Sequence, residues 1–181
     1  SNVTLVGVLN ADNMLNFPDF RAHERTFHMM VQVSGRSGRS KKQGRVAIQS
    51  FNPYHQILQQ VSTNSYEEMF SEQLQERWQY HYPPYYRIIK ITLKHRDYQK
   101  VDAGAIWLGK SLVNIFKENI LGPSVPSVSR VRNEYIRTLV LKIPPKQSLK
   151  TTKENITRIK NIFQAVKDFR PIKFIVDVDN Y

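Results

Sequence analysis

At 181 residues, with 40% hydrophobic and 11% aromatic side chains, the chain is long enough to bury a core in one domain or in a small domain with an appended segment. It contains no cysteine, which excludes disulfides and thiolate metal sites. No apolar run approaches the ~20 residues that a membrane-spanning helix needs, and no charged-then-apolar leader opens the sequence, so we expect an intracellular protein without a membrane partner.

The positive charge is concentrated in the second half of the chain. Residues 1–81 carry 8 Lys and Arg against 7 Asp and Glu, whereas residues 82–181 carry 19 against 8. Such an excess attracts phosphate polyanions, because each phosphate that a cation neutralises releases condensed counterions. Nucleic acid is therefore favoured over an anionic membrane or another acidic partner.

The first segment, residues 1–62, reads as strands and helices in alternation. Val3–Leu9 is a nearly continuous apolar run, which predicts a strand buried on both faces of a parallel sheet. The Gly/Ser-rich, basic segment Ser34–Gly44 predicts a loop. The other predicted elements of this segment are a helix over Arg21–Val33, a strand over Arg45–Gln49 and a short helix near His55–Ser62.

Residues 63–84 are predicted to connect two domains. Ser65 and Glu68 have the spacing of a capping box, which opens a helix over Ser65–Tyr80. Pro83 and Pro84 stop this helix, since proline cannot continue it and disfavours helix in the residue before it. Because the charge imbalance also begins here, we place the domain boundary between Tyr80 and Tyr85.

Residues 85–181 are predicted to form a basic domain of βαββαβ order. The ranges are a strand over Arg87–Lys94, a helix over Asp97–Asn119, strands over Ser124–Arg130 and Tyr135–Ile143, a helix opened by Thr151 and Glu154, and a strand over Ile172–Val178. This order is the ferredoxin-like split βαβ arrangement, an antiparallel sheet with both helices on one face. The fold permits many functions, so it identifies none.

One segment carries a pattern suited to phosphate chemistry. In Gln32–Arg39 a helix ends on Gly35 and presents Arg36 and Arg39 three residues apart. The arginine fork matches phosphate oxygens and keeps its charge, so such a pair can stabilise charge on a transferring γ-phosphate. The alternative is a basic loop that contacts solvent or DNA. The chain has neither a GxxxxGKS/T loop nor a DExH motif, so alone it is not expected to hydrolyse ATP.

Several motifs resemble those of one helicase family. QVSGRSGR, from Gln32 to Arg39, resembles motif VI of superfamily 2 helicases, and Asn10–Asp12 with Phe17–Arg25 resembles a motif V region. The further elements are Glu76-Arg77, Tyr82–Tyr85, Leu121-Gly122-Pro123 with Pro126, Arg130, Tyr135 and Arg137, and the closing Asp177-Val178-Asp179. In this order, over essentially the whole chain, they are similar to the C-terminal end of the PriA family of replication-restart helicases.

The resemblance implies a parent enzyme, an ATP-dependent 3′-5′ DNA helicase of the bacterial cytoplasm that recognises stalled forks and starts primosome assembly. Residues 1–62 would then be the end of the second RecA-like lobe, so the implied fold class is α/β plus α+β. ATP, Mg and Zn are implied for the parent, and no cofactor or metal site is expected in this chain. Arg36 and Arg39 take catalytic roles, with Arg39 as the arginine finger, and Gln32, Gly35 and Asp12 take nucleotide-binding roles. A loop or helix-cap acid is the alternative for Asp12.

The basic domain offers candidate contacts to DNA or to a protein partner. Forked and single-stranded DNA are the expected partners, with Tyr85, Tyr86 and Tyr135 available for base stacking. The resemblance also implies other primosome proteins and the acidic tail of single-stranded DNA-binding protein, for which Lys150 and Lys153 are the candidates. The basic candidates are Arg130, Arg132, Arg137, Lys142, Lys146, Lys150, Lys153 and Arg158.

Two other functional classes remain open. A basic ferredoxin-like domain is also common among ribosomal-type RNA-binding proteins, in which case the motif VI match is chance. The basic domain also fits a module that docks protein. Asp177 and Asp179 alternate on a predicted strand, where they suit a divalent metal or, more ordinarily, a pair that faces the basic sheet.

Overall fold

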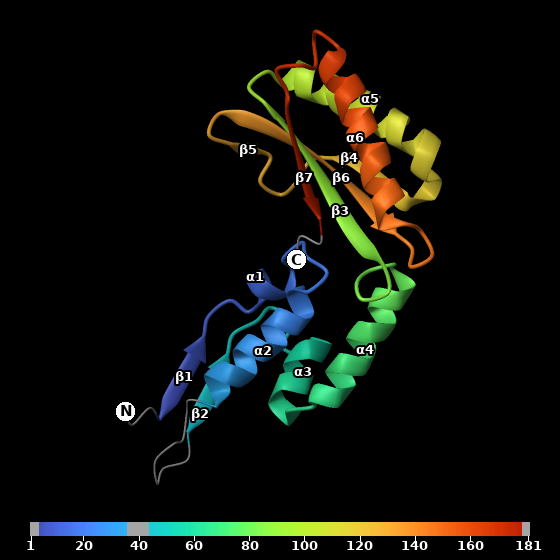
Figure 1. Cartoon of the computed structure of the whole chain (residues 1–181). Coiled ribbons are helices and arrows are strands. Elements are labelled where there is room, and N and C mark those ends of the chain that lie inside the picture. Colours follow the sequence, from blue (N-terminus) through green and yellow to red (C-terminus); the bar gives the residue numbers. More distant parts are fainter. Residues whose placement is uncertain (1–3, 36–43, 179–181) are drawn as a thin grey trace. The chain divides into compact units, whose positions relative to one another are not determined.

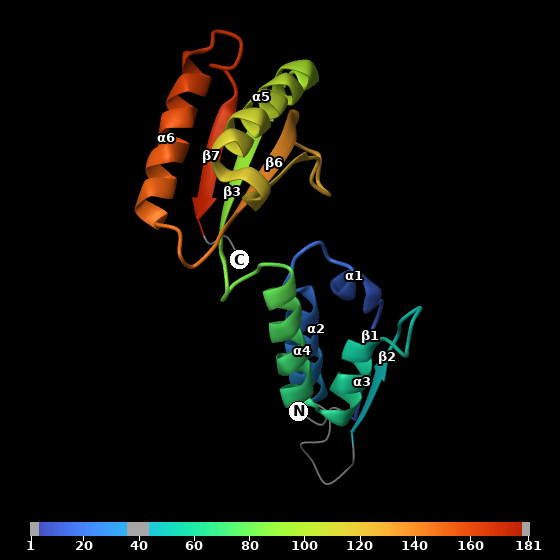
Figure 2. The ribbon, with the colours of Figure 1, turned by 90° about the vertical axis from the view of Figure 1, so that its right-hand side faces the viewer.

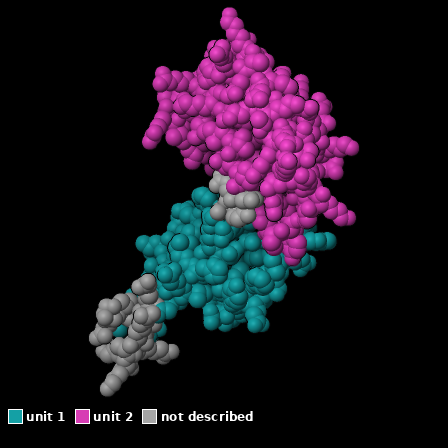
Figure 3. Space-filling model, viewed as in Figure 1, with its two compact units in different colours: residues 1–79 teal, residues 80–181 magenta. Residues whose placement is uncertain are grey.

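The computed structural model describes residues 4–35 and 44–178. The chain divides into two compact units of mixed α/β structure, residues 1–79 and residues 80–181 (Figure 3). The division lies next to the boundary expected between Tyr80 and Tyr85. Most of the segment predicted as a connector instead belongs to unit 1, since Met69 is buried in that unit's core.

Unit 1 contains a parallel strand pair with helices beside it (Figure 1). Its elements are β1 (Leu5–Val8), α1 (Asp12–Leu15), α2 (Ala22–Ser34), β2 (Arg45–Ile48), α3 (Gln56–Thr63) and α4 (Tyr66–Gln79). The strands pair in register from Leu5 with Arg45 to Val8 with Ile48, and α2 forms the crossover between them. The core is made by Ala11, Leu15, Phe27, Met30, Ile57, Leu58, Val61 and Met69.

The first strand is less buried than its sequence predicts. Leu5 is 64% exposed and Leu9 is 81% exposed. Within residues 4–35 and 44–178, β1 pairs with β2 alone, so the sheet is too narrow to cover both faces of either strand. The apolar run is suited to a wider sheet than these two strands make.

Unit 2 is an antiparallel sheet with its two long helices packed on one face (Figure 2). The strand order is β4-β6-β3-β7, and β5 pairs with β6. Its elements are β3 (Arg87–His95), α5 (Tyr98–Phe116), the 3-10 turn η1 (Lys117–Asn119), β4 (Ile120–Ser124), β5 (Arg130–Val131), β6 (Glu134–Ile143), α6 (Leu149–Ala165) and β7 (Lys173–Val178).

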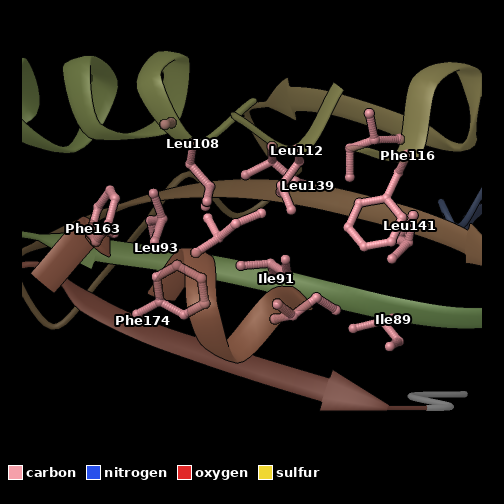
Figure 4. Packing of buried hydrophobic residues seen from close by; sticks show 14 of the residues in the cluster. Ile89, Ile91, Leu93, Leu108, Leu112, Phe116, Leu139, Leu141, Phe163 and Phe174 are labelled. Carbon is pink, nitrogen blue, oxygen red and sulfur yellow. The ribbon is translucent and has the colours of Figure 1, made fainter. Parts of the chain in front are cut away.

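The core of unit 2 follows from the alternation of side chains along its strands. Ile89, Ile91 and Leu93 of β3 are fully buried against the helices (Figure 4). Successive strand side chains point to opposite faces, so Lys90, Thr92 and Lys94 lie on the face that the helices leave open. The ring of Phe163, on α6, lies 5.1 to 5.8 Å from the rings of Phe169, Phe174 and Trp107.

Two differences from the predicted element boundaries have a local cause. Of the strand expected over Ser124–Arg130, only the end residues lie in strands, since Ser124 ends β4 and Arg130 begins β5. Pro126 lies between them and has no N–H for a strand ladder. The last helix begins at Leu149 rather than at Thr151, because the Ser148 side chain accepts a hydrogen bond of 3.3 Å from the Thr151 N–H and caps it.

Among the described residues, no helix is both long and apolar enough to cross a membrane.

Replacing Phe163, which is fully buried, by Ala should lower the free energy of unfolding of unit 2 by about 3–5 kcal/mol, because it removes the ring at the centre of this cluster and leaves a cavity. The neighbouring Ile162 is 51% exposed, so Ile162→Ala should cost less than about 0.5 kcal/mol. Urea unfolding can be followed by Trp107 fluorescence in a Trp78→Phe background. Equal losses in the two variants would contradict the packing described.

Candidate functional site

Asp12 lies at the carboxyl ends of β1 and β2, where it fastens the loop after β2. Its carboxylate accepts hydrogen bonds of 2.9 Å from the Ser50 hydroxyl and 3.1 Å from the Phe51 N–H. Desolvation alone would raise the pKa of Asp12, but these two bonds, together with the Asp12 backbone N–H and the nearby His55, hold the pKa below its ordinary value. Asp12 thus has a structural role in this loop, and its predicted role toward nucleotide remains a prediction.

Two histidines lie beside Asp12. The rings of His23 and His55 meet edge to face, with centroids 5.3 Å apart. His55 Nδ1 accepts a hydrogen bond of 3.2 Å from the Ile57 N–H and caps α3. Burial lowers the pKa of His55, the electrostatic interaction with His23 lowers it further, and Asp12 only partly opposes them. The neutral imidazole is therefore the form that caps this helix.

The motif VI-like segment begins at the opposite end of α2. Gln32 is exposed in the last turn, and it follows His23 by nine residues, about 14 Å along the helix axis. The structure therefore does not bring Asp12 next to Gln32 and Gly35. Arg36 and Arg39 lie outside the described residues.

Gly35 ends α2 in a conformation that any residue can adopt. Its φ is −66°, and a Cβ added there would approach only backbone oxygens, at 3.5 Å or more. Neither backbone strain nor a close contact with the described residues requires glycine at this position. Gly35 is exposed.

The basic residues predicted on unit 2 are divided between two ends of its sheet. Arg130 and Arg132 lie at the start of β6, whereas Lys142 and Lys146 lie at and just beyond its end. Six candidates are exposed: Arg130, Arg132, Lys146, Lys150, Lys153 and Arg158. We call Lys146, Lys150 and Lys153, which surround the start of α6, the α6 end. Arg158 lies midway along that helix.

Arg137 and Lys142 are held within unit 2. Arg137 is only 3% exposed, donates from Nε to the Asp102 carboxylate at 2.7 Å and lies over the Tyr98 ring. Lys142 donates to the Tyr80 carbonyl at 2.5 Å and lies 3.9 Å from the Tyr82 ring centroid. Burial lowers the pKa of Lys142. Arg137 therefore ties β6 to α5, and it is not part of the exposed basic surface.

Three cations that the sequence prediction did not include lie near Arg130 and Arg132. Lys94 pairs across the sheet with Lys173, and Lys173 makes a 2.7 Å ion pair with Glu134. The hydrogen bond from Lys173 and the charges of Lys173, Arg96 and Lys94 hold the pKa of Glu134 below its ordinary value, although desolvation opposes them. We call Lys94, Arg96, Arg130, Arg132 and Lys173 the hairpin end. Lys90 and Lys94 alternate in the sequence with Ile89, Ile91 and Leu93. This alternation is the pattern from which a basic open face of the sheet could have been predicted.

The tyrosines proposed for stacking already contact other side chains. Tyr135 lies between Arg130, whose guanidinium is 4.7 Å from its ring centroid, and Tyr98 at 5.5 Å. Tyr86 stacks on His81 with ring centroids 4.4 Å apart. Tyr85 and Tyr86 also line a pocket of about 420 Å³ beside the start of α6, together with Pro84, Arg87, Ile143, Pro144, Pro145, Gln147 and Leu149.

No group of three His, Asp or Glu side chains gathers as a metal site within residues 4–35 and 44–178. Asp177, one of the two acids proposed for a divalent metal, faces Lys90 across the sheet, and Asp179 lies outside the described residues.

A family model described as the C-terminal domain of primosomal protein N matches residues 79–181, more than half of the chain. The chain belongs to this family. The PriA match begins beside the division between the two units, and it confirms the family that the sequence motifs predicted.

The relatives of the chain carry the name replication restart protein PriA. The Bacillus subtilis (strain 168) protein is 39% identical over 147 residues, which cover 78% of this chain and 18% of the relative. The Haemophilus influenzae protein is 31% identical over 184 residues, covering 98% and 24%, and the Borreliella burgdorferi protein is 28% identical over 181 residues, covering 96% and 27%. The chain thus spans less than a third of the length of these PriA relatives.

Acidification should weaken the cap of α3. The fold holds the pKa of His55 below its ordinary value of ~6.5, so this contribution to stability is complete above that pH and is lost as the pH falls through the lower folded value. Between pH 7.5 and 5 we expect unit 1 to lose up to about 1 kcal/mol, the usual value of a helix cap.

His55→Asn keeps a capping acceptor that does not titrate, so thermal unfolding of this variant should depend less on pH. The exposed His81 provides the control, because His81→Asn removes one histidine and leaves the cap. The same pH dependence in the wild type and in His55→Asn would contradict the role of His55.

Proposed function

We propose that the chain is the C-terminal part of an ATP-dependent 3′-5′ DNA helicase that acts in replication restart, where it recognises stalled forks and starts primosome assembly. The observation that carries this proposal is similarity to proteins named replication restart protein PriA over 78% to 98% of the chain. The concentration of positive charge in residues 82–181, which the family match includes, agrees with a DNA partner.

Unit 1, in this proposal, is the end of the second RecA-like motor lobe. The parallel pair β1 and β2 with its α2 crossover supports it, as does the motif VI-like sequence that follows α2. Arg36 and Arg39, with Gln32 and Gly35, would approach the ATP phosphates, and the exposure of Gln32 and Gly35 suits such an approach. ATP and Mg would supply phosphoryl-transfer chemistry in the parent, and Zn would be held by other parts of the parent.

Unit 2, in this proposal, is a ferredoxin-like domain that binds forked and single-stranded DNA. The order β4-β6-β3-β7 supports the fold, since it places the first and third of its main strands at the centre of the sheet. The exposed side chains of Arg130 and Arg132, both in the predicted set, support the DNA contact. An RNA-binding role of ribosomal type has no comparable support from the relatives.

A second role is supported by the pocket beside α6. Tyr85, Tyr86 and Leu149 supply apolar lining, and Lys146 follows Pro145 at its edge. An acidic peptide that ends in an apolar side chain fits this combination of charge and cavity. We therefore propose that the α6 end receives the acidic tail of single-stranded DNA-binding protein, with Lys150 and Lys153 as charge partners, and that other primosome proteins meet the parent enzyme.

In the full-length parent, Arg39→Ala should reduce DNA-stimulated ATP turnover by at least about a thousandfold, the usual contribution of an arginine finger, with DNA affinity nearly unchanged. The matched control is Lys42→Ala, which removes a neighbouring cation outside the motif. ATP hydrolysis and DNA affinity are measured on the same preparations. Full turnover in Arg39→Ala would refute the finger assignment.

The 181-residue chain itself should bind DNA with a strong salt dependence. If unit 2 contacts about four phosphates, its affinity for duplex arms should fall about a hundredfold between 50 and 200 mM salt. Fluorescence anisotropy with forked DNA, single-stranded DNA and duplex RNA, at several salt concentrations, measures this. Tighter binding to RNA than to either DNA would overturn the helicase proposal in favour of an RNA-binding protein.

A further inference from the structure

The hairpin end of unit 2 carries five cations, whereas the α6 end carries three. Five cations, contributed by β3 and the residue after it, the β5–β6 hairpin and β7, lie there with the acids Glu134 and Asp97. Glu134 is paired with Lys173, and Asp97 caps α5 by accepting from the Lys100 N–H at 3.2 Å. The surface therefore keeps a net positive charge after its local acids are counted.

The turn between β5 and β6 presents Arg132 at its tip, and Arg130 lies at the start of β5 beside it. Arg132 and Asn133 have φ values of 48° and 65°, the left-handed pair that forms a tight two-residue hairpin turn. Figure 1 shows this hairpin projecting from the sheet. Arg132 is exposed at the tip, and Val131 beside it is 41% exposed.

Arg130 is already oriented by its neighbours. Its guanidinium lies over the Tyr135 ring and donates to the Asn133 side-chain oxygen. A guanidinium has five N–H donors, so most of them remain for a further partner. Less side-chain entropy is lost on binding when the fork is held in place beforehand.

We infer that the hairpin end binds duplex DNA, with the β5–β6 turn in a groove and Lys94, Arg96 and Lys173 against the flanking phosphates. The inference rests on the proposed DNA-binding function of unit 2 and assigns it a surface and a form of DNA. A DNA groove admits a two-stranded β-ribbon, and arginine forks match both phosphate oxygens and base edges.

The extent of this surface favours DNA over an acidic peptide. Its cations come from three segments of the chain and spread over the edge of the sheet. Such a spread suits DNA, whose phosphate charges are regularly spaced along the duplex. From Tyr135 to Lys142, β6 advances about 24 Å, which separates the hairpin end from the α6 end and its pocket. The two surfaces therefore serve different ligands.

The test compares two matched variants of the 181-residue chain. Arg130→Glu plus Arg132→Glu changes the hairpin end, and Lys150→Glu plus Lys153→Glu changes the α6 end by the same four charge units. All four side chains are exposed, and circular dichroism checks that both variants fold. The probes are a 20-base-pair duplex and an Asp-rich peptide with an apolar C-terminal residue, with affinity measured by anisotropy.

The hairpin variant should bind the duplex at least tenfold more weakly, and the slope of log affinity against log salt should fall by about 1.8, the value for two phosphates. The α6 variant should stay within threefold of the wild type for the duplex. Duplex affinity within threefold of the wild type in the hairpin variant, or equal losses in both variants, would overturn the inference. Loss of peptide binding in the hairpin variant with duplex binding retained would also overturn it, in favour of a protein-docking surface.

If unit 2 does not bind DNA at all, the binding measurements give a different result from the one expected if only the assigned surface is wrong. A wild-type chain that binds neither duplex nor single-stranded DNA at low salt refutes DNA binding by unit 2 altogether. A wild-type chain that binds DNA while the hairpin variant is unaffected refutes only the surface assigned here. Arg130→Lys plus Arg132→Lys keeps the charge, so a loss of duplex affinity in it points to groove contacts by the guanidinium forks.

Discussion

Unit 2 depends on the pairing of β3 with both of its neighbours. From residue 89 to residue 94 this strand pairs with β6 on one side and with β7 on the other. Its alternate side chains therefore divide between a face that packs on α5 and α6 and a face that the helices leave open. A slip of one residue in this register would bury Lys90 and Lys94 and expose Ile89, Ile91 and Leu93. The strand register that packs the apolar side chains of β3 into the core therefore also places Lys90 and Lys94 on the open face.

The pairing also determines which basic residues act together. Lys94 and Lys173 are 79 residues apart in the chain but are cross-strand partners. Arg130 and Lys142 are close in the chain but lie toward opposite ends of β6. Grouping the basic residues by their distance along the sequence therefore gave different sets from those that the sheet brings together. The sheet creates two surfaces, one around a rigid hairpin tip and one around a pocket, and their different shapes suit different ligands.

Local patterns in the sequence predicted most of the longer helices and strands, because these patterns depend on near neighbours along the chain. They did not predict the four-residue helix α1 or the division into β4 and β5. The strand over Arg87–Lys94 and the helix stop at Pro83 and Pro84 are predictions of this kind. Helix starts were less accurate: Ser148 and Thr151 are both suitable capping residues, and the first one caps α6. Pro126 interrupts the expected strand after β4, which its missing N–H explains.

The site residues were harder to predict because their surroundings are assembled from distant segments. Arg137 has the sequence character of a surface arginine, yet Asp102 and Tyr98 of α5 bury it. Lys142 is likewise covered by residues 80 and 82. For Gly35 the sequence was more informative than the structure, because its place in a motif is evident from the sequence. The fold of the described residues does not require a glycine at this position.

The narrow sheet of unit 1 has a consequence for handling the chain in solution. A strand at the edge of a sheet presents N–H and C=O groups that another chain can join. Among the described residues β1 pairs with β2 alone, and the side chains of Leu5 and of the following Leu9 are exposed. Exposed apolar strand edges are sites of intermolecular β-pairing. The isolated chain should therefore self-associate through unit 1 as its concentration rises.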